Sequence, residues 1–385
     1  MSGQLIPLEQ TCNFLSGYAW SAANFETDPV GLPIIRIQNV DAVRDSDFVY
    51  WGGEYDERFV VRPGDLLLTL SGSFRAVVWQ GPDALLNQRI VKLTPKPGYS
   101  LDWLLHVLRN GLNTISGLGR HALVSNVALA DLRQLKVPSH TSEEQRRIAA
   151  ILDQAETLRT QRRQALAHLD TLTQSLFLDM FGDPAVEASE WPKTQLDEVA
   201  ELVTGYPFRS EEYVGLADGI KLCRGVNVLP GRLDWRDMAC WPVAKVKEAE
   251  AFHLQAGDVV MAMDRPWISE GFKLAQVDAA DCPMLLVQRV ARIRPKSDLT
   301  NEYLFAVLNH VAFTRHCKPT ETTIPHISPK DIRSFAFPLP PLPLQQTFAT
   351  RIQAIEALKA THRAALAQLD ALFASLQQRA FAGGV

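Results

Sequence analysis

The chain has 385 residues, enough for about two or three domains of ordinary size. Hydrophobic residues make up 46% of it and charged residues 21%, which is the balance of a globular protein, and no stretch approaches the roughly 20 apolar residues of a membrane span. The net charge of −4 argues against a protein that binds nucleic acid strongly on its own and favours a subunit of an assembly, because phosphate binding is usually driven by a basic surface.

The N-terminal residues MSGQLIPLEQ lack the basic and apolar regions of a secretory signal, so we expect a cytoplasmic protein without membrane contact. The cysteines, which include no CxxC pair, are expected to be reduced thiols; they are Cys12, Cys223, Cys240, Cys282 and Cys317.

The second half of the chain repeats the first. NQRIVKLTPK at Asn87–Lys96 aligns with VQRVARIRPK at Val287–Lys296, and DLRQLKVP at Asp131 aligns with DIRSFAFP at Asp331, each 200 positions later. Upstream the offset falls to 193 and then to 188, so insertions lie between matching segments. The matching segments indicate a shared frame, and the unmatched stretches indicate loops, which usually carry differing specificities.

Each copy begins with a strand-rich domain. Strands are predicted at Ile34–Val40, Asp65–Leu70 and Ile90–Leu93, and again at Ile220–Val226, Asp258–Ala262 and Val290–Ile293. Helical segments are predicted at Leu101–Arg109 and Asn301–Asn309.

A long helix is predicted to end each copy. The first runs from Ser142 to Phe181 without Gly or Pro, with Ser142-x-x-Gln145 in the form of a capping box; the second runs from Leu344 to Phe381. Both carry a heptad pattern, which is typical of a coiled-coil seam, and we expect the two helices to pair rather than each to pack on its own domain. The predicted seam residues are Ile148, Leu152, Leu166, Leu169, Leu176, Phe348, Ile352, Ile355, Leu366, Leu369, Phe373 and Leu376.

The sequence shows no motif for catalysis. It has no GxxxxGK[ST] phosphate loop, no glycine-rich turn suited to a dinucleotide or S-adenosylmethionine, and no HExxH or Cys/His cluster. Pro82-Asp83 followed by Lys92 is a weak match to a nuclease site, but Ile90 stands at the position that needs an acidic ligand.

Three motifs recur in the same order in both halves. Each half has a Gly-Tyr run (Phe14–Tyr18 and Leu202–Phe208) and a Gly-Asp turn before a buried strand (Gly64-Asp65 and Gly257-Asp258). Each also has a strand that ends in Pro ahead of a Gln-bearing helix start, at Val137-Pro138 with Gln145 and at Phe337-Pro338 with Gln345. In this arrangement the chain resembles the specificity subunit of type I restriction-modification systems, over residues 5–383.

The resemblance implies an α+β fold with two pseudo-two-fold-related α/β target-recognition domains, separated by a pair of long antiparallel coiled-coil helices. The expected divisions are a first recognition domain at 1–139, a first spacer helix at 140–183, a second recognition domain at 184–340 and a second spacer helix at 341–385. The chain departs from the pattern at Leu342–Gln345, where the second copy lacks the acidic residue that precedes the glutamine in the first.

The resemblance also implies a function. Each recognition domain would read one half of a bipartite, asymmetric target in double-stranded DNA. The helices would dock two methyltransferase subunits, which methylate adenine, and a motor-nuclease subunit would join for restriction. The chain itself would catalyse nothing and hold no metal or cofactor, since S-adenosylmethionine, Mg²⁺ and ATP would be bound by the partner subunits.

Candidate DNA contacts are polar residues in the loops of each domain, since base edges are read by hydrogen-bond donors and acceptors. They are Arg36, Asn39, Ser71, Ser73, Arg75, Arg120 and His121 in the first domain, and Arg224, Asn227, Asp264, Arg265, Ser269, Lys273, Lys318, Thr322 and His326 in the second. Gln88-Arg89 and Gln288-Arg289 recur in both halves, which favours a scaffold role or a phosphate contact over base reading.

Two other classes of protein remain open on the sequence. One is an autonomous DNA-modifying enzyme with its own recognition domains. The other is a coiled-coil scaffold that binds protein only, against which the differing loop lengths argue.

Overall fold

The computed structural model describes residues 4–40, 48–70, 74–118, 128–186, 190–317 and 325–381, with the backbone alone for 112–118. The chain divides into two compact units. Unit 1 comprises Met1–Arg163 with Ala364–Val385, and unit 2 comprises Gln164–Arg363. Each unit therefore holds one half of each long helix.

Unit 1 contains two four-stranded sheets and a short strand pair. Its strands are β1 (Leu5–Pro7), β2 (Cys12–Ser16), β3 (Leu32–Ile35), β4 (Val49–Trp51), β5 (Val60–Val61), β6 (Leu66–Thr69), β7 (Ala76–Val78), β8 (Ala84–Leu86), β9 (Ile90–Pro95) and β10 (Lys136–Pro138). One sheet has the order β2-β9-β6-β7, the other has the order β4-β3-β8-β5, and β1 pairs with β10.

Unit 2 repeats this topology. Its strands are β11 (Lys193–Gln195), β12 (Ala200–Thr204), β13 (Gly219–Cys223), β14 (Val228–Leu229), β15 (Arg232–Leu233), β16 (Cys240–Pro242), β17 (His253–Leu254), β18 (Val259–Ala262), β19 (Trp267–Ile268), β20 (Gly271–Phe272), β21 (Leu274–Gln276), β22 (Met284–Leu286), β23 (Val290–Pro295) and β24 (Ala336–Pro338). Its sheets have the orders β12-β23-β18-β21 and β16-β13-β22-β17, and β11 pairs with β24. Two further hairpins, β14–β15 and β19–β20, are described in unit 2.

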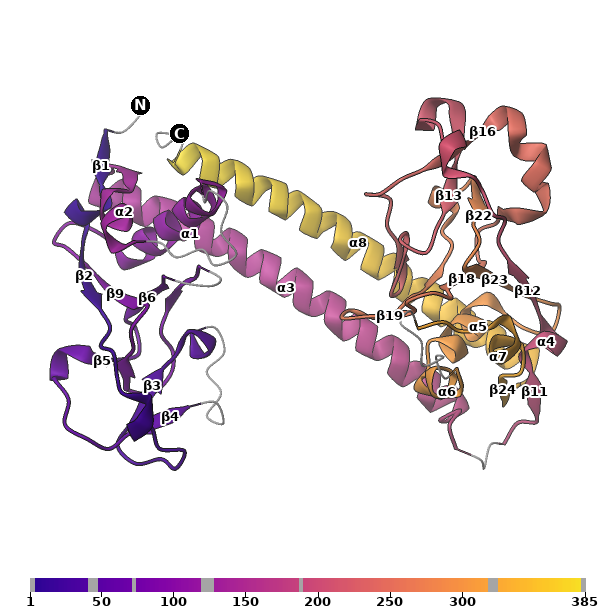
Figure 1. Cartoon of the computed structure of the whole chain (residues 1–385), viewed down its shortest axis with the longest axis horizontal. Coiled ribbons are helices and arrows are strands. Elements are labelled where there is room, and N and C mark those ends of the chain that lie inside the picture. The colour runs from indigo at the N-terminus through magenta and orange to yellow at the C-terminus, as the bar shows by residue number, and fades with distance from the viewer. Residues whose placement is uncertain are drawn as a thin grey trace. The chain divides into compact units, whose positions relative to one another are not determined.

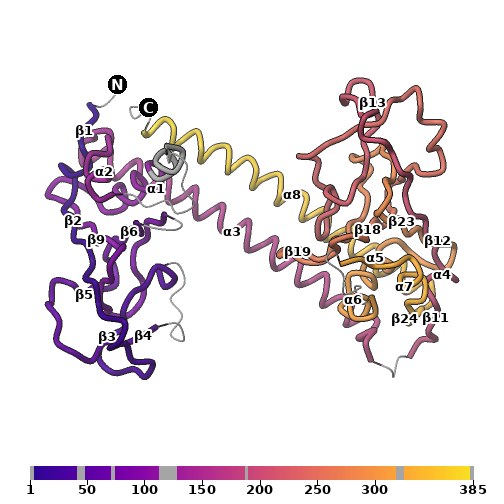
Figure 2. The backbone as a smooth tube through the Cα atoms, viewed as in Figure 1, coloured from indigo at the N-terminus to yellow at the C-terminus, as the bar shows by residue number. Residues whose placement is uncertain are grey.

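Helices cover one sheet of each unit. They are α1 (Leu101–Leu118) and α2 (Leu129–Gln134) in unit 1, and α4 (Leu196–Val199), α5 (Asn301–Leu308), α6 (Val311–His316) and α7 (Pro329–Arg333) in unit 2. Within unit 1, Figure 2 shows the sheet of β3, β4 and β5 at the end away from α1 and α2, with the sheet of β2, β6 and β9 in between. Apolar side chains fill the space between sheet and helix: Leu66, Leu93 and Trp103 lie in one buried cluster.

The long helices are α3 (Ser142–Phe181) and α8 (Leu342–Phe381), each a single uninterrupted helix in Figure 1. In unit 1 the start of α3 packs on the end of α8, with Ile148 and Leu152 against Leu376 and Ala380. In unit 2 the end of α3 packs on the start of α8, with Phe177 and Phe181 against Phe348. The pair is therefore antiparallel, and every predicted seam residue is buried or half-buried.

A buried glutamine ties each long helix to its unit. Gln145 is 1% exposed; it accepts a hydrogen bond from the Ser100 N–H at the start of α1 and donates to the carbonyls of Gly98 and His140. Gln345 makes the same set of bonds with Thr300, Asp298 and Pro340. These bonds fix the angle at which the helix leaves the domain, because a buried amide must keep its partners.

Two expectations about the ends of these helices were wrong. The capping box of α3 is formed by Thr141 and Glu144, whose carboxylate accepts from the Thr141 N–H at 2.9 Å, because Gln145 is used inside the domain. The second helix begins at Leu342 rather than Leu344, since Pro343 needs no N–H partner in a first turn.

Two predicted strands end earlier than expected. After Ile35 the chain forms a 3₁₀ turn at Ile37–Asn39, and after Cys223 it forms the equivalent turn at Arg224–Asn227. All five cysteines are free, as predicted, and burial raises the pKa of the Cys12 thiol to about 11 and that of Cys223 to about 12.

Candidate nucleic-acid interface

In unit 2 the loop after the Gly-Asp strand, residues 263–273, folds into the hairpin β19–β20. Trp267 packs on Phe272 with ring centroids 5.2 Å apart, and Phe272 packs on Phe313 of α6 at 5.9 Å. These aromatic contacts anchor the base of the hairpin on the domain core. Ser269 lies exposed at its tip, and the equivalent loop of unit 1, residues 70–75, is shorter.

Two loops that are distant in sequence meet beside this hairpin. The Asp264 carboxylate lies 2.5 Å from Nδ1 of His326 and 3.6 Å from Nη1 of Arg289. The backbone N–H of Arg265 donates to the Pro325 carbonyl at 2.9 Å. The structure thus joins the predicted residues Asp264 and His326 directly, and Arg265 binds the His326 loop through its backbone. Asp264 also lies beside exposed Arg289, which the prediction had assigned to the scaffold or to a phosphate.

Arg265 has a backbone φ of 45°, in the left-handed region that residues other than glycine rarely adopt, and its side chain is exposed. Lys273, also a predicted contact, does not reach the surface. It is 8% exposed, and its ammonium group donates to the Gly225 carbonyl. Burial lowers its pKa, and the charge of Arg265 lowers it further. Lys273 therefore braces the hairpin against the turn that follows β13.

Asn39 and Asn227, predicted to reach DNA, are both fully buried. The Asn39 side chain accepts a hydrogen bond from the Arg36 N–H at 2.9 Å, and Asn227 accepts from the Arg224 N–H at 3.2 Å. Asn227 also donates to the carbonyls of Asp234 and Asp237. Both asparagines close turns, and a buried amide engaged in this way does not extend to a base edge.

Two predicted arginines lie next to these turns. Arg36 is half-buried, and Arg224 bonds the Asp237 carboxylate at 2.9 Å. In unit 1, Arg75 is exposed and its N–H donates to the hydroxyl of buried Thr69 at 2.9 Å. The remaining predicted contacts lie outside the described residues; they are Ser71, Ser73, Arg120, His121, Lys318 and Thr322.

The helix pair offers a second kind of surface, which the seam pattern did not indicate. Leu158 and Leu372 in unit 1 are 38% and 47% exposed, and Leu172 and Leu358 in unit 2 are 50% and 53% exposed. All four share one heptad position beside the seam, so they recur at matching places of the repeat. The signal in the sequence was a leucine at the same non-seam position of both helices.

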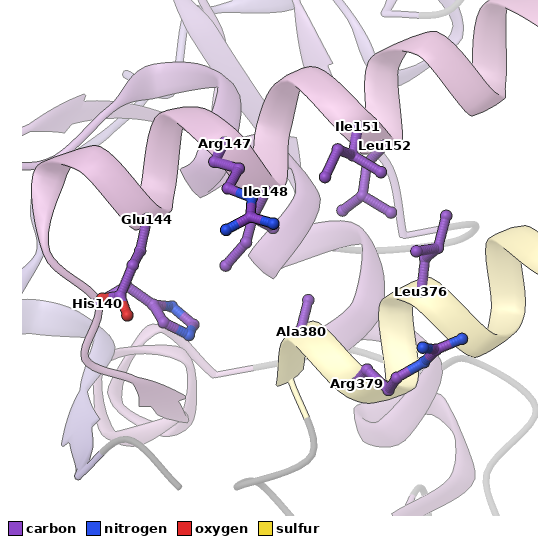
Figure 3. Close-up of a pocket in the computed structure, with 9 residues that line it drawn as sticks. All are labelled: His140, Glu144, Arg147, Ile148, Ile151, Leu152, Leu376, Arg379 and Ala380. Atoms are coloured by element: carbon purple, nitrogen blue, oxygen red, sulfur yellow. The ribbon is translucent and has the colours of Figure 1, made fainter. Parts of the chain in front are cut away.

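A pocket of about 290 Å³ opens in unit 1 between α3 and α8. Figure 3 shows Glu144 and Arg147 from α3 and Arg379 from α8 around an apolar floor that includes Leu152 and Leu376. Burial lowers the pKa of His140 at one edge, and the charge of Glu144 raises it in part. The hydrogen bonds from Thr141 lower the pKa of Glu144.

Metal sites and membrane-spanning helices are both absent from the described residues. No group of three or more His, Cys, Asp and Glu side chains in this part of the chain is arranged to hold a metal ion. Among the helices covered by the description, none has the length and apolar character needed to cross a membrane.

Comparison with known proteins identifies the family. The model of the type I restriction modification DNA specificity domain matches residues 5–168 and 188–371, one match for each copy of the repeat. The chain therefore belongs to this family, as the resemblance of its motifs predicted.

Curated relatives agree with this assignment. The specificity subunit of the Escherichia coli type I restriction enzyme EcoAI is 31% identical over 153 residues, which are 39% of this chain and 26% of that protein. The MjaVIII specificity subunit of Methanocaldococcus jannaschii is 24% identical over 319 residues, 79% of this chain and 75% of that protein. The chain thus matches only about a quarter of the EcoAI subunit but most of the archaeal one.

Solved structures share the fold. The S subunit of a type I restriction-modification system from M. genitalium has a TM-score of 0.61 at 13% identity, covering 98% of this chain and 96% of that one. A chain from a structure described for complex assembly and conformational transition of the type I R-M system has a TM-score of 0.52 at 18% identity, covering 99% and 97%. The fold class is confirmed: mixed sheets and helices in two repeated domains, with long helices shared between them.

Proposed function

We propose that the chain reads a bipartite, asymmetric target in double-stranded DNA, with each unit reading one half. The observation that supports this most directly is one two-sheet frame built twice with unlike loops at the same place, residues 70–75 in unit 1 and 263–273 in unit 2. Loops on a fixed frame are where proteins vary specificity. Exposed Arg75 and Arg265 supply donors of the kind that read guanine edges.

We further propose that the helix pair docks two methyltransferase subunits that modify adenine. The exposed leucines support this, since unit 1 carries Leu158 and Leu372 and unit 2 carries their counterparts in the repeat, Leu358 and Leu172. Large apolar side chains left in solvent at equivalent places of a repeat are candidates for contacts with a partner. Two equivalent patches fit two copies of one partner, and the net charge of −4 fits a subunit that binds DNA within an assembly.

On this proposal the chain is the non-catalytic member of its complex. S-adenosylmethionine would be held by the methyltransferase, and Mg²⁺ and ATP by a motor-nuclease subunit that joins for restriction. The family assignment supports this division, since the matching family is that of a DNA specificity domain and not of a methyltransferase domain.

The test is co-expression of the chain with its methyltransferase in a host that lacks other adenine methylation. Single-molecule sequencing should then reveal one asymmetric motif in two parts, and native mass spectrometry should find two methyltransferase copies per chain. The purified chain with S-adenosylmethionine should methylate nothing. A complex without DNA binding would favour a protein-only scaffold, and methylation by the chain alone would favour an autonomous enzyme.

A further inference from the structure

The Gly-Tyr motif and the Gln-Arg motif are joined by the same backbone hydrogen bonds in each half of the chain. In unit 1 the Tyr18 N–H donates to the Leu86 carbonyl at 3.0 Å, and the Gln88 N–H donates to the Tyr18 carbonyl at 2.9 Å. In unit 2 Tyr206 makes the same two bonds with Leu286 and Gln288, at 3.0 and 2.9 Å. The glycine is required because a Cβ on Gly17 would lie 2.0 Å from the Asn87 carbonyl oxygen.

The turn at the Gln-Arg motif holds its arginine in an unfavourable backbone conformation in both halves. The turn is closed by the Ile90 N–H to the Asn87 carbonyl at 3.2 Å, and in unit 2 by Val290 to Val287 at 3.1 Å. Arg89 has φ of 69° and Arg289 has φ of 68°. Glycine adopts this conformation without strain, so the backbone alone gives no reason for an arginine here, let alone twice.

The turn also adjoins the loop that differs between the units, residues 70–75 in unit 1 and 263–273 in unit 2, which we call the recognition loop. The Arg89 carbonyl accepts from the Leu70 N–H at 2.8 Å, and the Arg289 carbonyl accepts from the Met263 N–H at 2.9 Å. Leu70 and Met263 are the first residues after β6 and β18, where the loops begin. Both arginine side chains are exposed, that of Arg289 by 62%, and its contact with Asp264 at 3.6 Å leaves it in solvent.

We propose that Arg89 and Arg289 bind DNA phosphates, each setting the position of the adjacent recognition loop on its half of the target. Residues that are the same in both units cannot distinguish two unlike half-sites, whereas phosphates are the same in both. Phosphate contacts fix the register of a protein on the duplex, and base contacts specify the sequence. The inference rests on the proposed DNA-reading function and assigns a division of labour within it.

Substitution by glycine separates this role from a scaffold role. In Arg89→Gly and Arg289→Gly the backbone strain is relieved and the charge is lost. The variants are tested as complexes with the methyltransferase, by DNA affinity at several salt concentrations and by thermal unfolding. Arg89→Lys and Arg289→Lys keep the charge, and Arg58→Ala removes a 64%-exposed arginine elsewhere in unit 1 as a control.

The glycine variants should melt at or above the temperature of the natural protein. Each should lose on the order of tenfold in affinity for target and random DNA alike, and the slope of log affinity against log salt should fall by about one. The lysine variants should retain most of the affinity, and Arg58→Ala all of it.

Unchanged affinity in the glycine variants, or a lower melting temperature, would show that the arginines are scaffold residues. Loss confined to the target sequence would show base reading instead. If the natural complex bound no target DNA, the proposed function would fail first and this contact with it, so the two failures can be told apart.

Discussion

The two halves of the helix pair have ion pairs at matching positions but differ in the side chains that surround them. In unit 1, Arg159 lies between Glu156 and Asp370, 2.6 Å from the latter; in unit 2, Lys359 lies 2.7 Å from Glu356 and 2.9 Å from Asp170. These are matching positions of the repeat. A seam cation between the same two carboxylates is thus kept in both halves, although its side chain has changed, and in unit 1 Arg163 also lies 3.5 Å from Glu156 and 3.4 Å from Asp370.

The surroundings of the cation have changed with it. The Arg159 guanidinium stacks over the Phe373 ring at 4.4 Å, whereas Lys359 donates to the hydroxyl of Thr173, the residue that corresponds to Phe373. A guanidinium is planar and stacks well on an aromatic ring, while an ammonium group prefers a compact acceptor. Arginine therefore occurs opposite phenylalanine and lysine opposite threonine, which indicates that the cation and its neighbour changed together.

The apolar packing differs more than the charges do. Ile148 and Ala380 border the pocket of unit 1, and the corresponding residues in unit 2 are Phe348, which is fully buried, and the larger Met180. A duplicated frame therefore keeps its backbone and ion pairs while the size of the apolar side chains at matching positions changes.

The largest expected effect is a difference in the free energy of unfolding between matching substitutions in the two units. Phe348→Ala should lower the free energy of unfolding by about 3–5 kcal/mol, because it empties a closed aromatic cluster. Ile148→Ala, the matching change, should cost only about 1–2 kcal/mol, since Ile148 is half-buried beside a hollow. Denaturant unfolding of both variants measures the difference, and equal losses would mean that the two halves are packed alike.

Substitution of the exposed leucines tests partner binding by each half of the helix pair separately. Leu158→Ser with Leu372→Ser should remove one methyltransferase copy, and Leu172→Ser with Leu358→Ser the other, each weakening its site by about 2 kcal/mol or roughly 30-fold in Kd. Leu216→Ser, at a leucine that is 57% exposed elsewhere, serves as the control. Native mass spectrometry gives the stoichiometry; two copies retained in both variants would place docking elsewhere.

A smaller effect is expected from filling the hollow. Ala380→Met copies Met180 of unit 2 into unit 1 and should raise the free energy of unfolding by about 0.5–2 kcal/mol. The same substitution at exposed Ala367 of the same helix should change it by less than about 0.5 kcal/mol. If Ala380→Met destabilised the chain, the pocket would not be spare volume that a methionine can fill.

The repeat, the long helices and their seam could be predicted because each depends on a pattern within the sequence itself. The helix cap was misplaced by one residue because Ser142 and Thr141 are both good cap residues, and only the tertiary bonds of Gln145 decide between them. The strand at Ile34–Val40 was predicted too long because alternation continues through residues whose backbone turns at Asn39.

The candidate interface was harder to predict because polar residues in loops look alike in a sequence. Asn39, Asn227 and Lys273 had the expected residue types, but their side chains serve backbone groups inside the fold. The meeting of Asp264 with His326 joins two loops that no local pattern connects. The aligned Gln-Arg motifs did indicate a shared role, but their positive φ is visible only in the structure.

The most direct test of the central claim is an exchange of one recognition domain. Residues 5–138 are replaced by the corresponding region of a family member with a different target, while α3, unit 2 and α8 stay unchanged. Sequencing of methylated adenines in cells that express the hybrid with the methyltransferase should show one half of the motif changed and the other half and its distance unchanged. A motif in which both halves change, or in which neither does, would contradict the account that each unit reads its own half of the target.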